Sequence, residues 1–474
     1  MNKNDFHHKA LRKSIRKTAL FSLSLLVMLI AYVTYLQVIE SNTLAYNPLN
    51  RRTVEASKRV ERGKITDIHG KVLAQSTLAT TKEYKREYPY DVLFAHVVGY
   101  DSTKYGKAGI ESAYDGYLSG QTNPEKRLGA IGQLFQGGTG NTIMLTIDSR
   151  TQQAAYQALG SNRGAIVAIN PKTGAIIAMV SRPSFDPNNL ENNWGEISQS
   201  GSSPLLNRAS QGLYPPGSII KVLTAEAALA EQVATSNRQF TCTGALKIAP
   251  DYTLPEANNT AHGKIDLKQA LAVSCNVTFG QLALDLGRSR MAKQFERYGF
   301  TNPINSDIPE SAPKLPEFSR LSDGDLAQIG IGQGSLLVTP LRMAMLASTF
   351  ANKGTIMKPY LVQRITAPDG EIINETSPEK WLSPVSITLA EQVGSMMVSV
   401  VNEGTGTAAA VRGVQIAGKT GTAENPHGAP HAWFIGYAPA ENPQIAIAVI
   451  VENAGSGGRV AAPIARQIFV QALR

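Results

Sequence analysis

The chain has 474 residues, of which 43% are hydrophobic and 18% are charged, which is the composition of a folded protein of two or three domains rather than of a disordered or collagen-like one. With only two cysteines, it is neither a disulfide scaffold nor a multi-cysteine zinc module. Of its formal net charge of +9, +8 lies in residues 1–64, which hold twelve Lys or Arg and four acidic residues. The other residues are nearly neutral, so nucleic acid is not expected as a partner of the folded part.

Residues 18–39 form an uncharged and mostly apolar run near the N-terminus. A helix of that length spans about 33 Å, which is enough to cross a bilayer. A cleaved signal peptide usually has an apolar region of only about 7 to 15 residues and a cleavage site of small residues, which residues 43–45 faintly resemble. Six Lys or Arg precede the run, and basic residues stay on the cytoplasmic side. We therefore expect a cytoplasmic tail at 1–17, a single transmembrane anchor in the lipid bilayer at 18–39, and an extracytoplasmic remainder.

The extracytoplasmic part divides at a Gly-rich stretch, residues 129–140. Residues 40–140 mix basic stretches with short apolar runs and turn signals, which indicates a small, elongated pedestal module. Residues 141–474 show the periodicities of both strands and helices. Strands are expected at 141–147, 164–170, 175–181, 414–417, 432–437 and 445–451, and helices at 150–159 and 462–473. Strands at both ends with helices between them predict an α/β (α+β) domain whose sheet joins distant parts of the chain.

Residues 413–420 match the phosphate-loop pattern G-x-x-x-x-G-K-[ST], but their context argues against that function. A phosphate loop needs a helix directly after it, and residues 424–430, with two prolines, cannot begin a long helix. The seven histidines form no recognised zinc motif, and the sequence has no G-x-S-x-G nucleophile elbow. We therefore expect no nucleotide, metal or organic cofactor in the chemistry.

The remaining candidate for a catalytic site is a serine nucleophile with a lysine as its base. In the spacing Ser-x-x-Lys, both side chains lie on one face of a helix. This spacing begins at Ser14, Ser218, Ser311 and Ser377. Only Ser218, with Lys221, stands between a Pro-Pro-Gly turn and a strongly apolar helical segment, which places Ser218 in the first helical turn. A plain helix N-cap is the alternative interpretation of Ser218.

Two further motifs follow in the chain. Ser274-Cys275-Asn276 is the only Ser-x-Asn of the sequence and ends a helical stretch capped by Asp266, so that Ser274 and Asn276 can project into a cleft. An ordinary helix C-terminus, or a glycosylation acceptor at Asn276, is the alternative. Lys-Thr-Gly occurs at 172–174, at a predicted hairpin tip, and at 419–421, where it extends a predicted strand.

With these motifs in this order, the chain resembles the transpeptidase domain of bacterial penicillin-binding proteins, which share with serine β-lactamases an antiparallel sheet flanked by helices. Segments that also look like family positions, the first three of them in the N-terminal module of class B members, are 62–67, 109–111, 118–120, 207–209, 332–334 and 431–434. The glycosyltransferase domain of a class A member does not fit in the roughly 100 residues before the transpeptidase domain. The resemblance therefore favours class B.

The resemblance implies a monofunctional peptidoglycan D,D-transpeptidase that forms an acyl-enzyme on Ser218 and is inhibited by β-lactams. Lys221 would act as the base, and burial together with the charge of Lys419 would lower its pKa from about 10.4. Ser274 would relay a proton to the departing D-Ala, and Asn276 would bind the peptide backbone. The other implied sites are a carboxylate site formed by Lys419, Thr420 and Thr422 beside Gly421, and an oxyanion hole formed by the backbone N–H groups of Ser218 and Thr422.

The expected partners are stem peptides ending in D-Ala-D-Ala, the bilayer, and a polytopic glycosyltransferase of the SEDS type. Three alternatives stay open: a D,D-carboxypeptidase, a serine β-lactamase, and a membrane adaptor or activator of a cell-wall glycosyltransferase. The β-lactamase would need a fast route for water to the acyl-enzyme, such as a glutamate that the sequence lacks at the expected place. Cys242 and Cys275 are both expected outside the cell, and they can form a disulfide only if their Cα atoms lie within about 7 Å.

Overall fold

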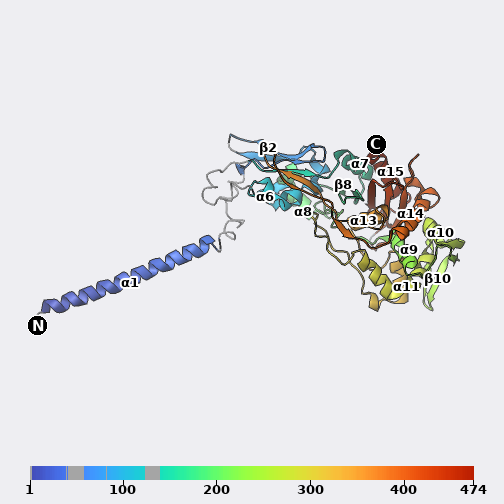
Figure 1. Cartoon of the computed structure of the whole chain (residues 1–474), viewed down its shortest axis with the longest axis horizontal. Helices are drawn as coiled ribbons and strands as arrows, with labels where there is room; N and C mark the ends of the chain where they lie inside the picture. Colours follow the sequence, from blue (N-terminus) through green and yellow to red (C-terminus); the bar gives the residue numbers. More distant parts are fainter. Residues whose placement is uncertain (1–2, 39, 41–57, 82, 123–138, 427) are drawn as a thin grey trace. The chain divides into compact units, whose positions relative to one another are not determined.

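The chain divides into two compact units, of which one holds the N-terminal helix α1 (Lys3–Val38) together with Leu78–Tyr84 (Figure 1). The computed structural model describes residues 3–38, 40, 58–81, 83–122, 139–426 and 428–474. Nearly all of the Gly-rich stretch at 129–140 lies outside these described residues. Within α1, the segment Leu11–Gln37 is long and apolar enough to cross a membrane. Its large apolar side chains between Leu20 and Ile30 are at least half exposed, as a helix surrounded by lipid requires.

The core of the folded remainder is a five-stranded sheet whose neighbouring strands are all antiparallel. In spatial order its strands are β17 (Ala417–Ala423), β18 (His431–Ala438), β19 (Ile445–Val451), β7 (Gly164–Ile169) and β8 (Ile176–Arg182). The pairing of β19 with β7, for example Val449 opposite Ile166, joins the end of the chain to the start of the domain, as the sequence predicted.

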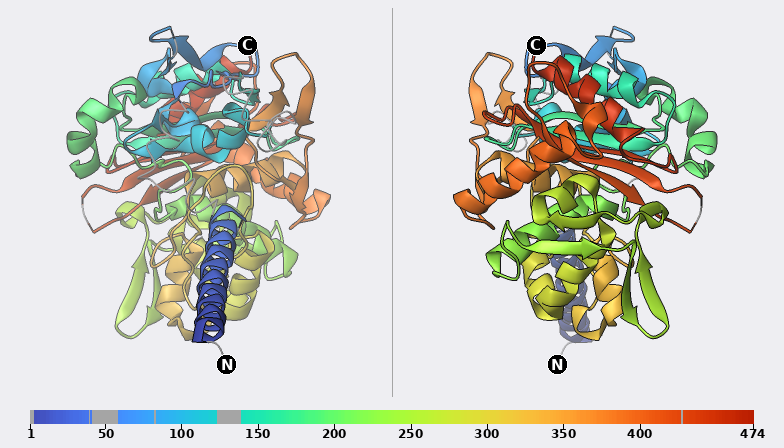
Figure 2. Two further views of the ribbon diagram at one scale, coloured as in Figure 1. Left: turned by 90° about the vertical axis from the view of Figure 1, so that its left-hand side faces the viewer. Right: turned by 90° about the vertical axis from the view of Figure 1, so that its right-hand side faces the viewer.

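Side chains alternate between the two faces of this sheet, and each face is covered by helices (Figure 2). Ile166 and Val449 pack in the cluster that includes residues of α7 and α15, whereas Ala165 and Ile450 pack in the larger core with α13. The bounds of these helices are Ser149–Leu159 for α7, Pro340–Ala351 for α13 and Ala461–Ala472 for α15. The fully apolar strands follow from this burial on both faces.

A second, six-stranded sheet connects the pedestal segment to the rest of the molecule. Its strands in spatial order are β15 (Ile372–Glu375), β14 (Val362–Thr366), β6 (Thr142–Leu145), β1 (Ile65–Thr66), β2 (Val72–Leu78) and β3 (Tyr84–Glu87). Strand β14 pairs with β6 at Ile365 and Ile143. Beside this sheet, the buried Glu111 carboxylate binds Arg62 at 2.8 Å and Arg86 at 2.6 Å. Residues 61–77 and 85 onward accordingly form one compact unit.

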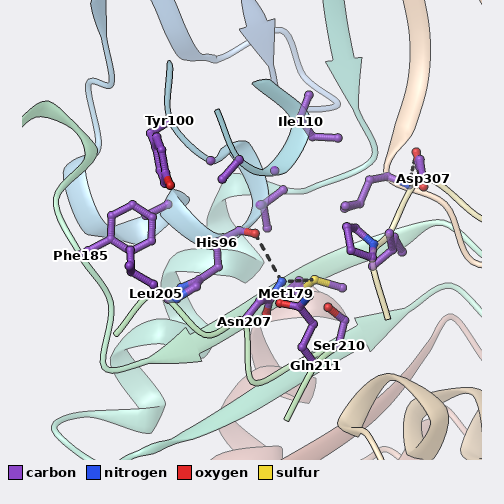
Figure 3. A pocket seen from close by; sticks show the side chains of 18 residues that line it. His96, Tyr100, Ile110, Met179, Phe185, Leu205, Asn207, Ser210, Gln211 and Asp307 are labelled. Carbon is purple, nitrogen blue, oxygen red and sulfur yellow. Dashed lines mark hydrogen bonds between the residues drawn. The ribbon is translucent and has the colours of Figure 1, made fainter. Parts of the chain in front are cut away.

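A cavity lies where helix α4 (Ala95–Val98) of the pedestal segment meets strand β8 (Figure 3). Across it, Asn207 Nδ2 donates a hydrogen bond to the His96 carbonyl at 3.3 Å and lies 3.6 Å from Met179 Sδ. Burial lowers the pKa of His96 to about 4, so the ring is neutral at pH 7. None of the residues that line this cavity belongs to the three predicted motifs.

The region between the two parts of the central sheet is mainly helical. Besides α13, its helices are α8 (Leu190–Gln199), α9 (Lys221–Ala230), α10 (Leu267–Val273), α11 (Asn276–Arg297), α12 (Asp323–Gly330) and α14 (Ile387–Asn402). Its short strands are β9 (Gln239–Cys242), which pairs with β12 (Gly263–Asp266), β10 (Ala245–Ala249), which pairs with β11 (Tyr252–Pro255), and β13 (Ile356–Met357), which pairs with β16 (Lys380–Leu382). Helix α10 begins where predicted, because Asp266 and Gln269 form a capping box.

One predicted strand differs from the structure. Of residues 414–417, only Ala417 lies in a strand, which continues from there to Ala423. Residues 411–414 form a tight turn, and residues 414–416 connect this turn to the strand. In the turn, Val414 N–H donates to the Val411 carbonyl at 3.2 Å and Gly413 has a φ of +79°. The apolar alternation therefore marks a half-buried Val414 and a buried Ile416 that lead into the strand, rather than residues of its ladder.

Candidate active site

Ser218 lies in the first turn of a helical segment, as its sequence context predicted. The turn is a 3-10 helix, Gly217–Ile220, which continues into α9 at Lys221. Ser218 does not cap this helix, because the N-cap position is Pro216. The turn is fixed by a hydrogen bond from Gly217 N–H to the Gly332 carbonyl at 2.7 Å. Ser218 is half-buried, and within the described part of the chain its hydroxyl makes no hydrogen bond, which leaves the oxygen available to a substrate.

Lys221 follows one helical turn after Ser218, and its side chain is fully buried. Its ammonium group donates to the Ser274 carbonyl at 2.6 Å, to Asn276 Oδ1 at 2.6 Å and to Ser274 Oγ at 3.3 Å. Burial lowers its pKa to about 8, although the charge of Glu256 opposes this change. A lysine with this pKa is partly unprotonated near neutral pH and can accept a proton.

Ser274 and Asn276 lie in the short link between α10 and α11. Ser274 adopts the left-handed conformation, with a φ of +64°, at the C-cap of α10, and Asn276 is the first residue of α11. The reversal of the chain at Ser274 turns both side chains toward Lys221. The hydroxyl of Ser274 accepts a second hydrogen bond, from Lys419 Nζ at 2.9 Å, so it lies between the two amines.

Lys419 comes from β17, the edge strand of the central sheet, where it lies opposite Ile435. Burial, and then the positive charge of Lys221, lower the pKa of Lys419 well below its ordinary value. The repulsion between the two amines disfavours the protonated form of each of them. Lys221 keeps its proton more readily because a carbonyl and an amide oxygen accept from it at 2.6 Å and because Glu256 is nearby.

The rest of the Lys-Thr-Gly motif brings β17 directly against the turn that holds Ser218. A side chain at Gly421 would meet the Pro216 carbonyl at 3.0 Å, so glycine permits this approach. Thr420 is buried and its hydroxyl lies 2.5 Å from that of Thr405, whereas Thr422 is exposed. Since no other described strand pairs with the outer edge of β17, an extended peptide can pair with it near Ser218.

The other matches to these motifs lie elsewhere. Lys172, in the second Lys-Thr-Gly, lies at the tip of the hairpin and donates to Asn442 Oδ1 at 2.7 Å. Ser14 belongs to α1, and Ser311 pairs by its backbone N–H with the Ser210 carbonyl. The phosphate-loop interpretation finds no support, because strand β17, and no helix, follows residue 416.

Two residues at the site were not singled out from the sequence. Trp433 on β18 is fully buried and donates from Nε1 to the Pro215 carbonyl at 3.0 Å, which supports the turn before Ser218. Glu256 is also buried, and its Oε2 accepts from the backbone N–H groups of Asn276 at 2.6 Å and Val277 at 3.1 Å. Trp433 lies in one of the segments compared with the family, but nothing in the local sequence marks Glu256.

Residues 164–470 match the sequence model of the penicillin binding protein transpeptidase domain. The chain belongs to this family. Residues 62–141 match the penicillin binding protein A dimerisation domain, which confirms the class B resemblance of the N-terminal module. This penicillin-binding protein is 36% identical to peptidoglycan D,D-transpeptidase PbpA of Mycolicibacterium smegmatis, over 97% of this chain and 99% of the relative. It is 35% identical to PbpA of Mycobacterium tuberculosis, over 97% of this chain and 99% of that protein.

Solved structures agree with these matches. The ceftriaxone acyl-enzyme complex of penicillin-binding protein A from M. tuberculosis superposes with a TM-score of 0.83 at 32% identity, covering 88% of this chain and 99% of that one. The D,D-transpeptidase domain from Eggerthella lenta gives a TM-score of 0.81 at 35% identity, covering 88% of this chain and 98% of that one. The predicted fold of this penicillin-binding protein, an antiparallel sheet flanked by helices with an N-terminal apolar helix, is confirmed.

Proposed function

We propose that this protein is a peptidoglycan D,D-transpeptidase that cross-links stem peptides through an acyl-enzyme on Ser218. The observation that carries the proposal is the placement of Ser274 Oγ between two buried amines, Lys221 Nζ at 3.3 Å and Lys419 Nζ at 2.9 Å. Ser218 precedes Lys221 by one helical turn, and its hydroxyl makes no hydrogen bond among the described residues. Such a chain of groups can take a proton from one oxygen and deliver it to a leaving amine. The family and the names of its relatives agree with this activity.

The first half of the proposed reaction forms the acyl-enzyme. Lys221 in its neutral form takes the proton of Ser218 while the serine oxygen attacks the carbonyl carbon of the D-Ala-D-Ala bond. The peptide C–N bond then breaks, and the departing D-Ala nitrogen receives its proton through Ser274. In the second half, the amine of a neighbouring stem peptide attacks the ester, loses a proton to the same groups, and restores the Ser218 hydroxyl. No metal ion or organic cofactor enters these steps.

Substrate binding is proposed to use β17 and the first turn of α11. Lys419, Thr420 and Thr422 hold the terminal carboxylate, with Gly421 allowing the close approach of the strand, and Asn276 binds the peptide backbone. The backbone N–H groups of Ser218 and Thr422 form the oxyanion hole, which stabilises the negative oxygen that develops only in the transition state. A β-lactam carries a carboxylate and a reactive amide in the same arrangement and acylates Ser218.

The protein is a single-pass membrane protein by the length and composition of α1. We further propose that residues 1–17 are cytoplasmic, that 18–39 cross the bilayer, and that 40–140 form a pedestal and 141–474 a transpeptidase domain outside the cell. The basic residues before the span support this orientation. A polytopic SEDS-type glycosyltransferase is the proposed membrane partner, since new glycan strands must be made close to where they are cross-linked.

The test is covalent labelling of the full chain in detergent with a fluorescent penicillin. We expect the wild type and Ser311→Ala, a matched Ser-x-x-Lys serine outside the site, to be labelled at the same rate, and Ser218→Ala not to be labelled. Unchanged labelling of Ser218→Ala would refute the assignment. With a stem-peptide donor and an amine acceptor, formation of a cross-linked product distinguishes a transpeptidase from a carboxypeptidase. Growth supported by Ser218→Ala in a strain that needs this protein would favour the adaptor function instead.

A further inference from the structure

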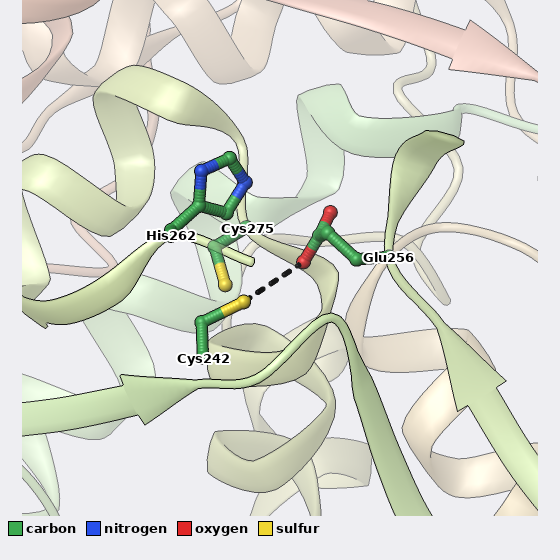
Figure 4. Close-up of side chains that lie close together, drawn as sticks. All are labelled: Cys242, Glu256, His262 and Cys275. Carbon is green, nitrogen blue, oxygen red and sulfur yellow. Dashed lines mark hydrogen bonds between the residues drawn. The ribbon is translucent and has the colours of Figure 1, made fainter. Parts of the chain in front are cut away.

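Four side chains that bind metal ions well converge behind the Ser274–Asn276 link (Figure 4). Cys242 ends β9, Glu256 follows β11, His262 precedes β12, and Cys275 is the N-cap residue of α11. Their ligand atoms all lie within 4.8 Å of one another. Three of the four residues are buried and His262 is half-buried, and both cysteines are free thiols. The disulfide that the sequence left open is thus not formed in this structure.

The surroundings of Cys275 favour a negatively charged sulfur. Its Sγ accepts hydrogen bonds from the backbone N–H of Thr278 at 3.4 Å and from the Thr278 hydroxyl at 3.2 Å. It also lies at the N-terminus of the 22-residue helix α11, where the helix dipole stabilises an anion. A metal ion bound at this point would stabilise the thiolate form of Cys275 further.

The carboxylate of Glu256 is oriented toward the same point. Its Oε2 accepts from two backbone N–H groups at the start of α11 and lies 3.8 Å from the Cys242 thiol, which donates to it. Its Oε1 accepts from the backbone N–H of Ala257 at 3.1 Å. A carboxylate fixed by three amides and directed at two thiols and an imidazole has the arrangement of a metal ligand with its supporting hydrogen bonds.

We propose that Cys242, Glu256, His262 and Cys275 bind one zinc ion. Two sulfurs, one nitrogen and one oxygen suit zinc better than magnesium or calcium, which prefer oxygen ligands. Zinc bonds of about 2.0 to 2.3 Å in a tetrahedron separate the ligand atoms by roughly 3.3 to 3.8 Å, so the four atoms need only a small contraction. On binding, the two thiols release two protons, and nothing is oxidised or reduced. Four protein ligands close the site, which makes it structural rather than catalytic.

The consequence, which rests on the proposed function, is that zinc holds Ser274 and Asn276 in place for catalysis. Cys275 lies between them, and Glu256 binds the backbone N–H of Asn276, so two of the four ligands fix the link between α10 and α11. The formal charge of the cluster is the same with and without zinc. One carboxylate with two thiols carries −1, as does Zn²⁺ with one carboxylate and two thiolates. Zinc therefore acts on Lys221 through position and not through added charge.

The first experiment measures zinc directly on the full chain, purified in detergent without chelator. Elemental analysis should find about one zinc per chain, and a thiol reagent should modify the two cysteines only after a chelator is added. Cobalt in place of zinc should give the sulfur-to-metal charge-transfer absorption of a thiolate site. The proposal is overturned if the chain takes up no zinc, or if its intact mass under non-reducing conditions is lower by two hydrogen atoms, which identifies a disulfide.

Variants separate binding from its effect on catalysis. Cys242→Ser and His262→Ala should lose zinc, His262→Asp should retain it because a carboxylate replaces the imidazole, and His69→Ala, an exposed histidine outside the cluster, should bind normally. Zinc-free Cys242→Ser should react with the fluorescent penicillin about tenfold more slowly. Labelling of that variant at the wild-type rate would refute the positioning effect. Failure of the wild type to react at all would refute the proposed function and leave the zinc measurement valid.

Discussion

In the proposed reaction the charge of Lys221 controls acylation, and a substitution of Asn276 can change that charge. Asn276 Oδ1 accepts from Lys221 Nζ at 2.6 Å. Asn276→Asp puts a negative oxygen at that position, and an opposite charge at such a distance raises the pKa of a lysine by about 1 to 3 units. A rise from about 8 to about 10 reduces the neutral fraction of Lys221 at pH 7 from roughly 9% to roughly 0.1%, so acylation should slow by about 100-fold.

The assay is the second-order rate of acylation by a fluorescent penicillin, measured on the full chain from pH 6 to pH 10. For the wild type, the rate should rise with pH and level off above about pH 8, because the neutral amine is the base. For Asn276→Asp, the bend in the pH profile, which is the pH at which the rate levels off, should move to higher pH. Asn276→Ala is the matched control, since it removes an acceptor from the ammonium without adding charge and should move the bend to lower pH. Two variants that lose activity with the bend at the wild-type pH would refute the assignment of Lys221 as the base.

Three further changes test other parts of the molecule. Arg62→Met should lower the free energy of unfolding by about 3 kcal/mol, measured with denaturant, because it removes a partner from the buried carboxylate of Glu111. Gly332→Ala should slow acylation at least about tenfold, because the added Cβ would lie 2.0 Å from the Gly217 carbonyl and displace the turn before the nucleophile. Lys172→Ala should leave the acylation rate unchanged, since that lysine lies at a hairpin tip.

Each of these has a simple control or contrary outcome. Arg320→Met breaks an exposed pair with Glu317 and should cost less than about 1 kcal/mol, so an equal loss in the two arginine variants would contradict the burial argument. Gly195→Ala has open space around the new methyl group and should acylate normally. A slowed Lys172→Ala would mean that the hairpin tip takes part in the reaction.

The strands and helices of the central domain were largely predictable, because their burial is reflected in the pattern of apolar residues close together in the sequence. Strands buried on both faces read as continuous apolar runs, and α10 begins at a capping box whose residues are adjacent in sequence. The turn at 411–414 was missed, since apolar residues leading into a strand have the same pattern as the strand itself. The pairing of β14 with β6, which adds β14 to the six-stranded sheet, was also not predictable, because the paired residues are more than 200 positions apart in the sequence.

The three motifs could be found from sequence, but the groups around them could not. Ser218, Ser274 and Lys419 stand in short patterns whose order is informative. Glu256 has no pattern around it, because its function depends on contacts with the start of a helix that is 20 residues further along. The lowered pKa values of Lys221 and Lys419 likewise depend on burial and on contacts that only the folded chain defines.

The two buried amines also couple recognition to the proton concentration of the surroundings. In the free protein, burial and then the neighbouring charge of Lys221 lower the pKa of Lys419, so this amine binds its proton weakly. A ligand that brings a carboxylate to Lys419 supplies the missing countercharge and favours the protonated amine, so the complex takes up a proton from solvent as it forms. Ligands without that carboxylate gain nothing from this uptake. In the proposed reaction, the buried pair thus gives the site a preference for chain-terminal peptides that weakens as the pH rises.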